Sequence, residues 1–85
     1  MLTSGQIKMA RAALGWSIDV LAEKTSISSR TIKRIEATTG IPNATAANLK
    51  LIKHTLEQAG IEFIGSAEEG PGVRLWKENN TEVYQ

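Results

Sequence analysis

The sequence of 85 residues contains no cysteine and has only one histidine. The absence of cysteine excludes both a disulfide framework and a zinc site built on thiolates. No segment approaches the roughly 20 apolar residues of a membrane-spanning helix, and no apolar run follows a basic cluster at the N-terminus as in a secretory signal peptide. We therefore expect one small cytoplasmic domain, whose stability is marginal unless a second subunit adds to it.

Motifs for catalysis, metal binding and nucleotide binding are also missing from the sequence. The single histidine, His54, lies between Lys53 and Thr55 in a helical pattern, where a lone exposed imidazole is usually solvated. No glycine-rich phosphate loop is present, and residues 70–72, Gly-Pro-Gly, are typical of a turn. We expect no enzymatic activity, no cofactor and no metal.

The net charge of +1 conceals an uneven distribution along the chain. Residues 1–58 carry eight Lys or Arg and four Asp or Glu, a net charge of +4, whereas residues 59–85 carry two and five, a net charge of −3. A basic body beside an acidic tail is common in proteins that bind nucleic acid. The acidic tail is expected to lie away from the surface that meets phosphate.

The first helix is predicted from its two ends. Thr3 followed by Gln6 is a capping-box pattern, so the helix begins near Ser4, and Gly15 ends it. The apolar face of this helix also contains a charged residue, Arg11. A buried arginine needs an ion-pair partner, because an unpaired buried charge costs several kcal/mol.

Two shorter helices follow within the next 22 residues. Ser17 is an N-cap for a helix over residues 18–25, and Ser28 is an N-cap for a helix over residues 29–37. The third helix repeats Ile32 and Ile35 at core spacing. Because the connection between the two helices is about three residues long, we expect them to cross steeply.

A fourth helix and a hairpin complete the predicted fold. Asn43 is the expected cap of a helix that runs to Ala59, before Gly60. Two short β-like runs, residues 61–64 and 73–76, flank a turn-rich segment, which suggests a hairpin with a long loop over residues 65–72. The predicted fold is mainly α, with four helices followed by a short β-hairpin within residues 61–78 and a frayed tail at residues 79–85.

Residues 18–37 read IDVLAEKTSISSRTIKRIEA. The distinctive positions in and around this segment are Trp16, Ser17, Ala22, Ile27, Ser28, Ile32, Ile35, Glu36, Ala37 and Pro42. The pattern resembles the phage-repressor and Cro-like (XRE-type) family, and the resemblance covers about residues 2–59. It implies a four-helix repressor-like helix-turn-helix domain at residues 1–60, a double-stranded DNA partner and a role as a transcriptional regulator, most simply a repressor. The family's buried ion pair maps onto Arg11 and Glu36.

Two positions depart from the family pattern. Many relatives begin the second helix with a glutamine that contacts the DNA backbone, whereas this chain has Ile18. One phosphate contact is then lost, or Ile18 faces a protein. Ser26 replaces a glycine of the turn, where a left-handed conformation costs a non-glycine residue roughly 1 kcal/mol.

One face of the third helix is predicted to contact DNA. At about 100° per residue, its polar arc of about 140° contains Ser29, Arg30, Lys33 and Arg34, and the resemblance points to these positions and to Ser28. Arg30 is the best candidate for reading a base, since its planar fork can bind guanine O6 and N7. Lys33 is the candidate phosphate contact. The alternative is an ordinary solvated basic face.

The C-terminal part of the chain contains more apolar residues than a small hairpin easily buries. Those residues, with one leucine of the fourth helix, are Leu51, Ile61, Phe63, Val73, Leu75 and Trp76. They either pack onto the first and fourth helices or form an interface. We expect a homodimer, whose two copies would engage half-sites about 34–36 Å apart. The alternative function is an antitoxin-like module whose C-terminal segment binds a toxin-like protein partner.

Overall fold

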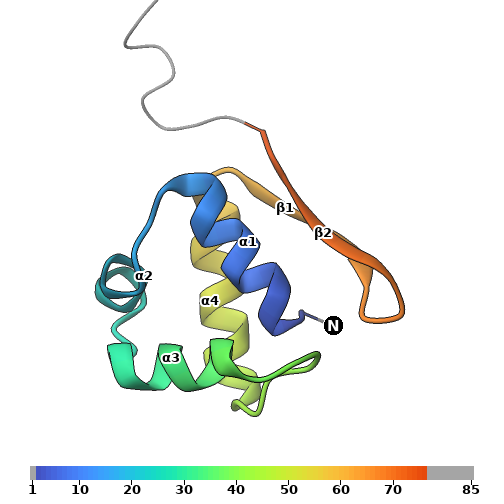
Figure 1. Cartoon of the computed structure of the whole chain (residues 1–85). Coiled ribbons are helices and arrows are strands. Elements are labelled where there is room, and N and C mark those ends of the chain that lie inside the picture. The colour runs from blue at the N-terminus through green and yellow to red at the C-terminus, as the bar shows by residue number, and fades with distance from the viewer. Residues whose placement is uncertain (1, 77–85) are drawn as a thin grey trace, which may run out of the picture.

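The computed structural model describes residues 2–76 of the chain and confirms a mainly helical fold with a C-terminal hairpin (Figure 1). The elements in chain order are α1 (Ser4–Leu14), α2 (Ile18–Thr25), α3 (Ser29–Ala37), α4 (Ala46–Gln58), β1 (Ile61–Ser66) and β2 (Glu69–Leu75). The expected tail at residues 79–85 lies outside the described residues. Among the described helices, none combines the length and hydrophobicity that crossing a bilayer requires.

The first three helices begin and end where their local sequence predicts. The Thr3 side chain accepts from the Gln6 backbone N–H and the Gln6 side chain accepts from Thr3, so both halves of the capping box are present. Ser17 and Ser28 cap α2 and α3 in the same way, each accepting a backbone N–H three residues later. Gly15 has φ +70°, a left-handed conformation that ends α1.

The predicted cap of α4 is wrong. Thr45, rather than Asn43, is the N-cap, and its hydroxyl accepts a free N–H of the first turn, from Asn48 at 3.1 Å. Pro42 is buried, and its carbonyl accepts a hydrogen bond from Ala44 N–H at 3.1 Å. This turn carries the chain past Asn43 before the helix can start, so α4 begins at residue 46.

The predicted eight-residue hairpin loop is also wrong, because most of it pairs as strand. β1 and β2 are antiparallel, with Ile61 opposite Leu75 and Ser66 opposite Glu69, and the register is irregular between residues 64 and 66. Gly65 allows this irregularity: it has φ +77°, and an added Cβ would lie 2.3 Å from the Gly70 carbonyl oxygen. Trp76 follows the end of β2, and its backbone N–H donates to Gly60.

The core lies between the four helices and the near face of the hairpin. Its largest fully buried apolar side chains come from all four helices and are Ile7, Leu21, Ile32, Ile35, Ile52 and Leu56. From the hairpin, Ile61 is 3% exposed, and Phe63, Val73 and Leu75 pack partly buried against the same cluster. The hairpin therefore buries most of its apolar side chains within its own chain, onto α1 and α4.

Side chains in the first turn of α1 form hydrogen bonds with both the hairpin and the end of α3. The buried Gln6 side chain donates to the carbonyls of Ile64 and Gly72, one on each strand, at 2.9 and 3.0 Å. Two residues earlier, the Ser4 hydroxyl donates to the Ile35 carbonyl at 2.7 Å. These bonds satisfy buried polar groups and fix both the hairpin and α3 relative to α1.

Candidate nucleic-acid interface

The outer face of α3 presents three exposed cations. Ile32 and Ile35 are fully buried on the opposite face, so Arg30, Lys33 and Arg34 point away from the core. Within residues 2–76, no carboxylate lies in ion-pair range of these three side chains. The structure thus brings the three predicted basic residues together on one helix, where their donors are available to another molecule.

The two serines at the start of α3 already have partners in the chain. The Ser28 hydroxyl accepts from the Thr31 backbone N–H at 3.1 Å and donates to the Thr31 hydroxyl at 2.9 Å. The Ser29 hydroxyl donates to Asp19 Oδ1 of α2 at 2.6 Å. Ser28 is therefore used as the helix cap, and the carboxylate of Asp19 joins the predicted face.

The turn between α2 and α3 contains a strained residue. Ser26 adopts φ 61° and ψ 18°, the left-handed conformation expected at this position, and is the one non-glycine residue with positive φ among the described residues. On either side of it, the Thr25 hydroxyl donates to the Leu21 carbonyl and accepts from Ile27 N–H. At the other end of α2, Ile18 packs partly buried against the core. The turn is thus held by local bonds despite lacking glycine.

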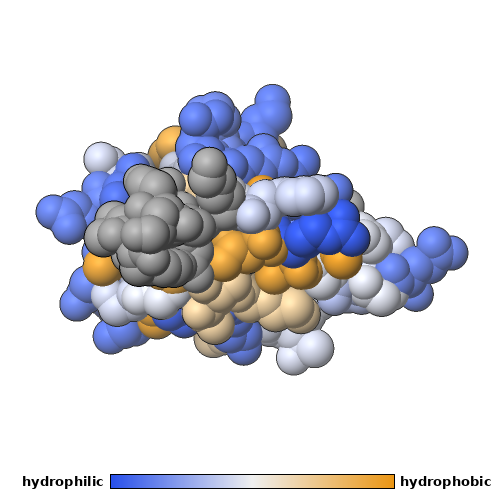
Figure 2. Space-filling model, turned by 90° about the horizontal axis from the view of Figure 1, so that it is seen from above, coloured by the Kyte–Doolittle hydropathy of each residue, from blue (hydrophilic) through white to orange (hydrophobic). Residues whose placement is uncertain are grey.

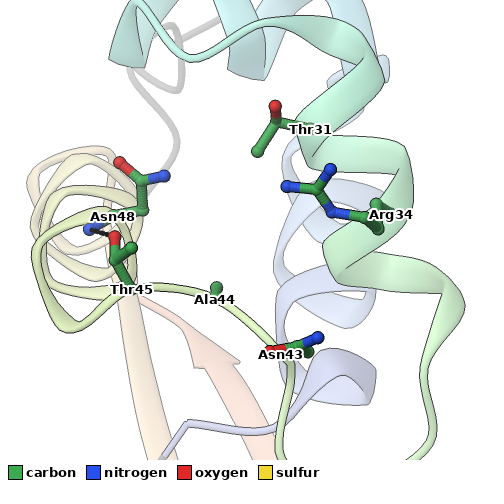
Figure 3. Close-up of a pocket in the computed structure, with 6 residues that line it drawn as sticks. All are labelled: Thr31, Arg34, Asn43, Ala44, Thr45 and Asn48. Atoms are coloured by element: carbon green, nitrogen blue, oxygen red, sulfur yellow. Dashed lines mark hydrogen bonds between the residues drawn. The ribbon is translucent and has the colours of Figure 1, made fainter.

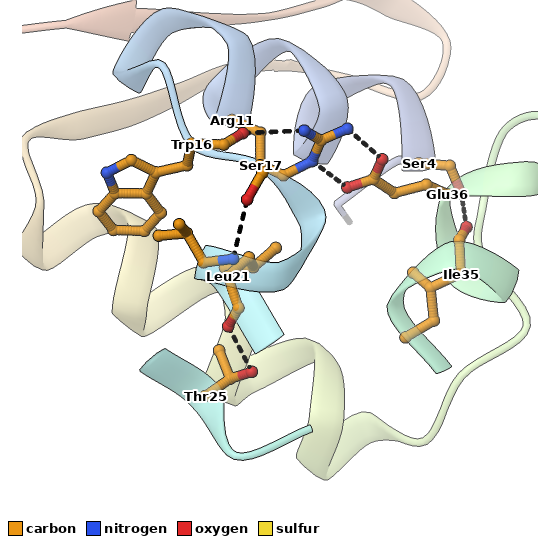
Figure 4. A network of polar contacts seen from close by, with 9 residues as sticks. Ser4, Arg11, Trp16, Ser17, Leu21, Thr25, Ile35 and Glu36 are labelled. Carbon is orange, nitrogen blue, oxygen red and sulfur yellow. Dashed lines mark hydrogen bonds and ion pairs between the residues drawn. The ribbon is translucent and has the colours of Figure 1, made fainter. Parts of the chain in front are cut away.

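Arg11 and Glu36 form a bidentate ion pair that connects α1 to α3 (Figure 4). Arg11 Nε and Nη2 each donate to a Glu36 oxygen at 2.8 Å, and Nη1 donates to the Trp16 carbonyl at 2.9 Å. The side chains are 19% and 5% exposed. The hydrogen bond to Glu36 raises the pKa of Arg11 above its ordinary value, against the opposing effect of burial. Glu36 lies at the margin of the buried face of α3, next to Ile32, so the pair fixes this helix to α1 at that margin.

A polar groove of about 510 Å³ runs between α3 and the start of α4 (Figure 3). It is lined by Thr31, Arg34, Asn43, Ala44, Thr45 and Asn48. The N-terminal end of a helix carries a partial positive charge, so α4 and Arg34 contribute positive potential to the same groove. Asn43 and Asn48 were not predicted as parts of this surface, although the start of a helix is a common place for anion contacts.

The six residues expected at a partner surface do not form one exposed patch. Ile61 is part of the core and is not accessible in the folded chain, and the half-buried Phe63, Val73 and Leu75 pack against that core. Leu51 and Trp76 remain exposed, at 40% and 67%. This outcome favours packing onto α1 and α4 as the main role of the hairpin's apolar residues.

Trp76 takes part in a polar cluster on the outer side of the hairpin. Its indole N–H donates to Glu62 Oε1 at 2.7 Å, the same oxygen that accepts from Arg74 Nη1 at 3.1 Å. The Arg74 guanidinium also lies over the Trp76 ring, 5.4 Å from its centroid. These contacts give the exposed ring a defined orientation.

Comparison with known proteins identifies one family. A family model described as a helix-turn-helix domain matches residues 6–48, which include most of α1, all of α2 and α3 and the first residues of α4. No curated protein and no solved structure matches the chain.

Proposed function

The chain belongs to the helix-turn-helix domain family, and from this premise we propose that it is a sequence-specific double-stranded DNA-binding regulator. In this proposal α3 enters the major groove, as the second helix of the motif does in such domains. The observation that carries the proposal is the face of Arg30, Lys33 and Arg34, which is exposed and has no carboxylate in ion-pair range within residues 2–76.

The three cations are suited to different parts of the duplex. Arg30, in the first turn of α3, is proposed to read guanine, because its fork matches the O6 and N7 acceptors. Lys33 is proposed to contact phosphate, since a flexible ammonium neutralises charge without reading sequence. Arg34, one turn after Arg30, is the second candidate for a base contact.

The groove beside α3 supports a further contact with the DNA backbone. Arg34 lies on its α3 side, and Asn43, Thr45 and Asn48 lie at the start of α4 (Figure 3). Amide and hydroxyl groups at the positive end of a helix are good partners for phosphate oxygens. Such a contact would compensate for Ile18, whose side chain cannot donate a hydrogen bond from the start of α2.

We propose repression in the cytoplasm as the biological outcome, following the resemblance to phage repressors. A homodimer is the proposed binding unit, because two copies of α3 can engage two half-sites. Support for a contact between copies comes from exposed apolar side chains, including Met9 at 42%, Leu51 at 40% and Trp76 at 67%. Separately, in the view from above the molecule, apolar residues gather near the middle of the visible surface, with hydrophilic residues around them (Figure 2).

The antitoxin-like alternative places a different protein against these exposed apolar side chains. The two proposals differ in what the purified chain does alone: a homodimer forms without any other protein, whereas the alternative requires a toxin-like partner. The hairpin buries Ile61 in the core and is bonded to Gln6. Deletion after Gly60 would therefore damage the fold, and surface substitutions are the cleaner test of either proposal.

Selection from a pool of random duplexes tests the proposed function. We expect the full chain to enrich a defined sequence. The Arg30→Ala variant should lose the base preference at one position of that sequence. Arg74→Ala removes an exposed arginine from the hairpin and is the matched control, which should enrich the same sequence as the parent. Failure of the parent chain to enrich any sequence, with no measurable affinity for duplex DNA, would contradict the proposal.

A further inference from the structure

An acidic side chain lies at the start of the proposed DNA-reading helix. Asp19 is in the first turn of α2, and its Oδ1 accepts from the Ser29 hydroxyl at 2.6 Å. This distance is that of a charge-assisted O–H···O⁻ hydrogen bond. Because Ser29 is the first residue of α3, the bond brings the carboxylate of α2 to the end of α3 that reaches furthest into a groove.

The hydrogen bond leaves Asp19 with unused acceptors. An ionised carboxylate has about four lone-pair sites, and the described residues provide Asp19 with one hydrogen bond and no ion pair. The Ser29 hydroxyl has its single proton directed at Asp19, so this hydroxyl also offers only lone pairs. Asp19 and Ser29 therefore present hydrogen-bond acceptors at the first turn of α3, whereas Arg30, the next residue along the helix, presents donors.

A carboxylate on a DNA-facing surface weakens binding to every sequence, because it repels phosphate. It favours a particular base only if it accepts a hydrogen bond there. In the major groove cytosine offers the N4 amino group as a donor, whereas guanine offers N7 and O6 and thymine offers O4, all of them acceptors. Adenine is intermediate, since its N6 donor lies beside the N7 acceptor.

We propose that Asp19 is a specificity-determining residue that accepts a hydrogen bond from cytosine N4, and that Ser29 is the residue that positions it. The inference rests on the proposed DNA-binding function and adds a residue of α2 to the reading surface. It assigns Ser29 a positioning role through Asp19 in place of the direct DNA contact predicted for it.

Base preference in the selected site is the readout, compared among variants in one selection experiment. The parent chain should prefer cytosine at one position by about tenfold, within the roughly 5- to 150-fold range of a good base contact. Asp19→Ala should lose this preference and keep the preferences at the other positions. Asp19→Asn should change it to adenine, because an amide can bind N6 and N7 together. Ser29→Ala should reduce it in part.

Glu23→Ala is the matched control, since it removes one exposed carboxylate from α2, one turn after Asp19. It should leave the cytosine preference unchanged. The inference is overturned if Asp19→Ala and Glu23→Ala both raise the affinity for all sequences alike, for then Asp19 acts only as a repelling charge. It is also overturned if a parent chain that selects a defined sequence shows no cytosine preference. Absence of any duplex binding overturns the proposed function and this inference with it.

Discussion

At the scale of single residues, Arg30 and Lys33 share a helix face but differ in their expected contribution to binding. Arg30→Ala should relax the sequence preference at one base pair and cost about 1–3 kcal/mol of binding free energy. Lys33→Ala should weaken binding to all sequences similarly and reduce the slope of log K against log salt by about one. Equilibrium titrations of selected and scrambled duplexes at several salt concentrations measure both effects.

Lys53→Ala is the control for Lys33, because Lys53 is an exposed lysine on α4 in an ion pair with Glu57. Its salt slope should equal that of the parent chain. If the Arg30 and Lys33 variants both bound like the parent, α3 would not be the contact surface.

Ser26 stores conformational strain that substitution can release. Its φ of 61° costs an L-residue roughly 1–2 kcal/mol, while glycine adds about 0.4–1 kcal/mol of unfolded-state entropy. Ser26→Gly is therefore expected to raise the free energy of unfolding by about 0.5–1 kcal/mol in urea titrations. Ser26→Ala retains a Cβ and should give no such gain. An equal effect of both substitutions would show that backbone strain is not the cause.

At the scale of secondary-structure elements, the position of α3 depends on its attachment to α1. Glu36→Ala leaves the Arg11 guanidinium in a largely buried site without its partner, so we expect a loss of roughly 3–5 kcal/mol in the free energy of unfolding. The double variant Arg11→Met/Glu36→Met should recover much of this loss, since an apolar pair leaves no charge behind. Urea unfolding monitored by circular dichroism gives the free energy of unfolding of the parent chain, the Glu36→Ala variant and the double variant.

If Glu36→Ala lowers the free energy of unfolding by less than about 1 kcal/mol, the pair does not hold α3 in place, because a loss of that size is typical of an exposed ion pair. A double variant as unstable as Glu36→Ala would contradict this role of the pair too. In that case the loss would come from the packing of the long side chains rather than from the unpaired charge.

The elements differ in how well the sequence predicts them. The first three helices are specified by short-range signals, such as the capping box at Thr3 and the glycine at position 15, which act within a few residues. The start of α4 is not so specified, because Asn43 and Thr45 are both good caps, and the turn at Pro42 decides between them. The predicted length of the hairpin loop is too great, because Gly65 allows an irregular register and most of the predicted loop pairs as strand.

The candidate site shows the same division. The basic face of α3 follows from helical periodicity, so Arg30, Lys33 and Arg34 were predicted from the sequence alone. The contact of Asp19 with Ser29 and the groove that includes Asn48 depend on how two helices cross. No spacing within one helix encodes such contacts between elements.

At the scale of the whole molecule, the exposed apolar side chains of α4 and of the end of the hairpin, Leu51 and Trp76, are expected to bring two copies together. Sedimentation equilibrium without DNA should show a dimer of the parent chain. The double variant Leu51→Ser/Trp76→Ser should shift it toward monomer, because these side chains are 40% and 67% exposed and available to a second copy. Ile41→Ser is the matched control, since Ile41 is 44% exposed in the segment between α3 and α4. A parent chain that stays monomeric at high concentration would contradict the homodimer.

The central claim, that α3 is the surface that meets DNA, is tested most directly by mapping amide chemical shifts while a duplex is added to the labelled chain. The account predicts the largest shift changes in α3, at Asp19 and around the groove at the start of α4. The amide shifts of Ile64 and Gly72, the hairpin residues that bind the Gln6 side chain, should stay almost unchanged. Changes concentrated on β1 and β2, with α3 unaffected at saturating duplex, would contradict it.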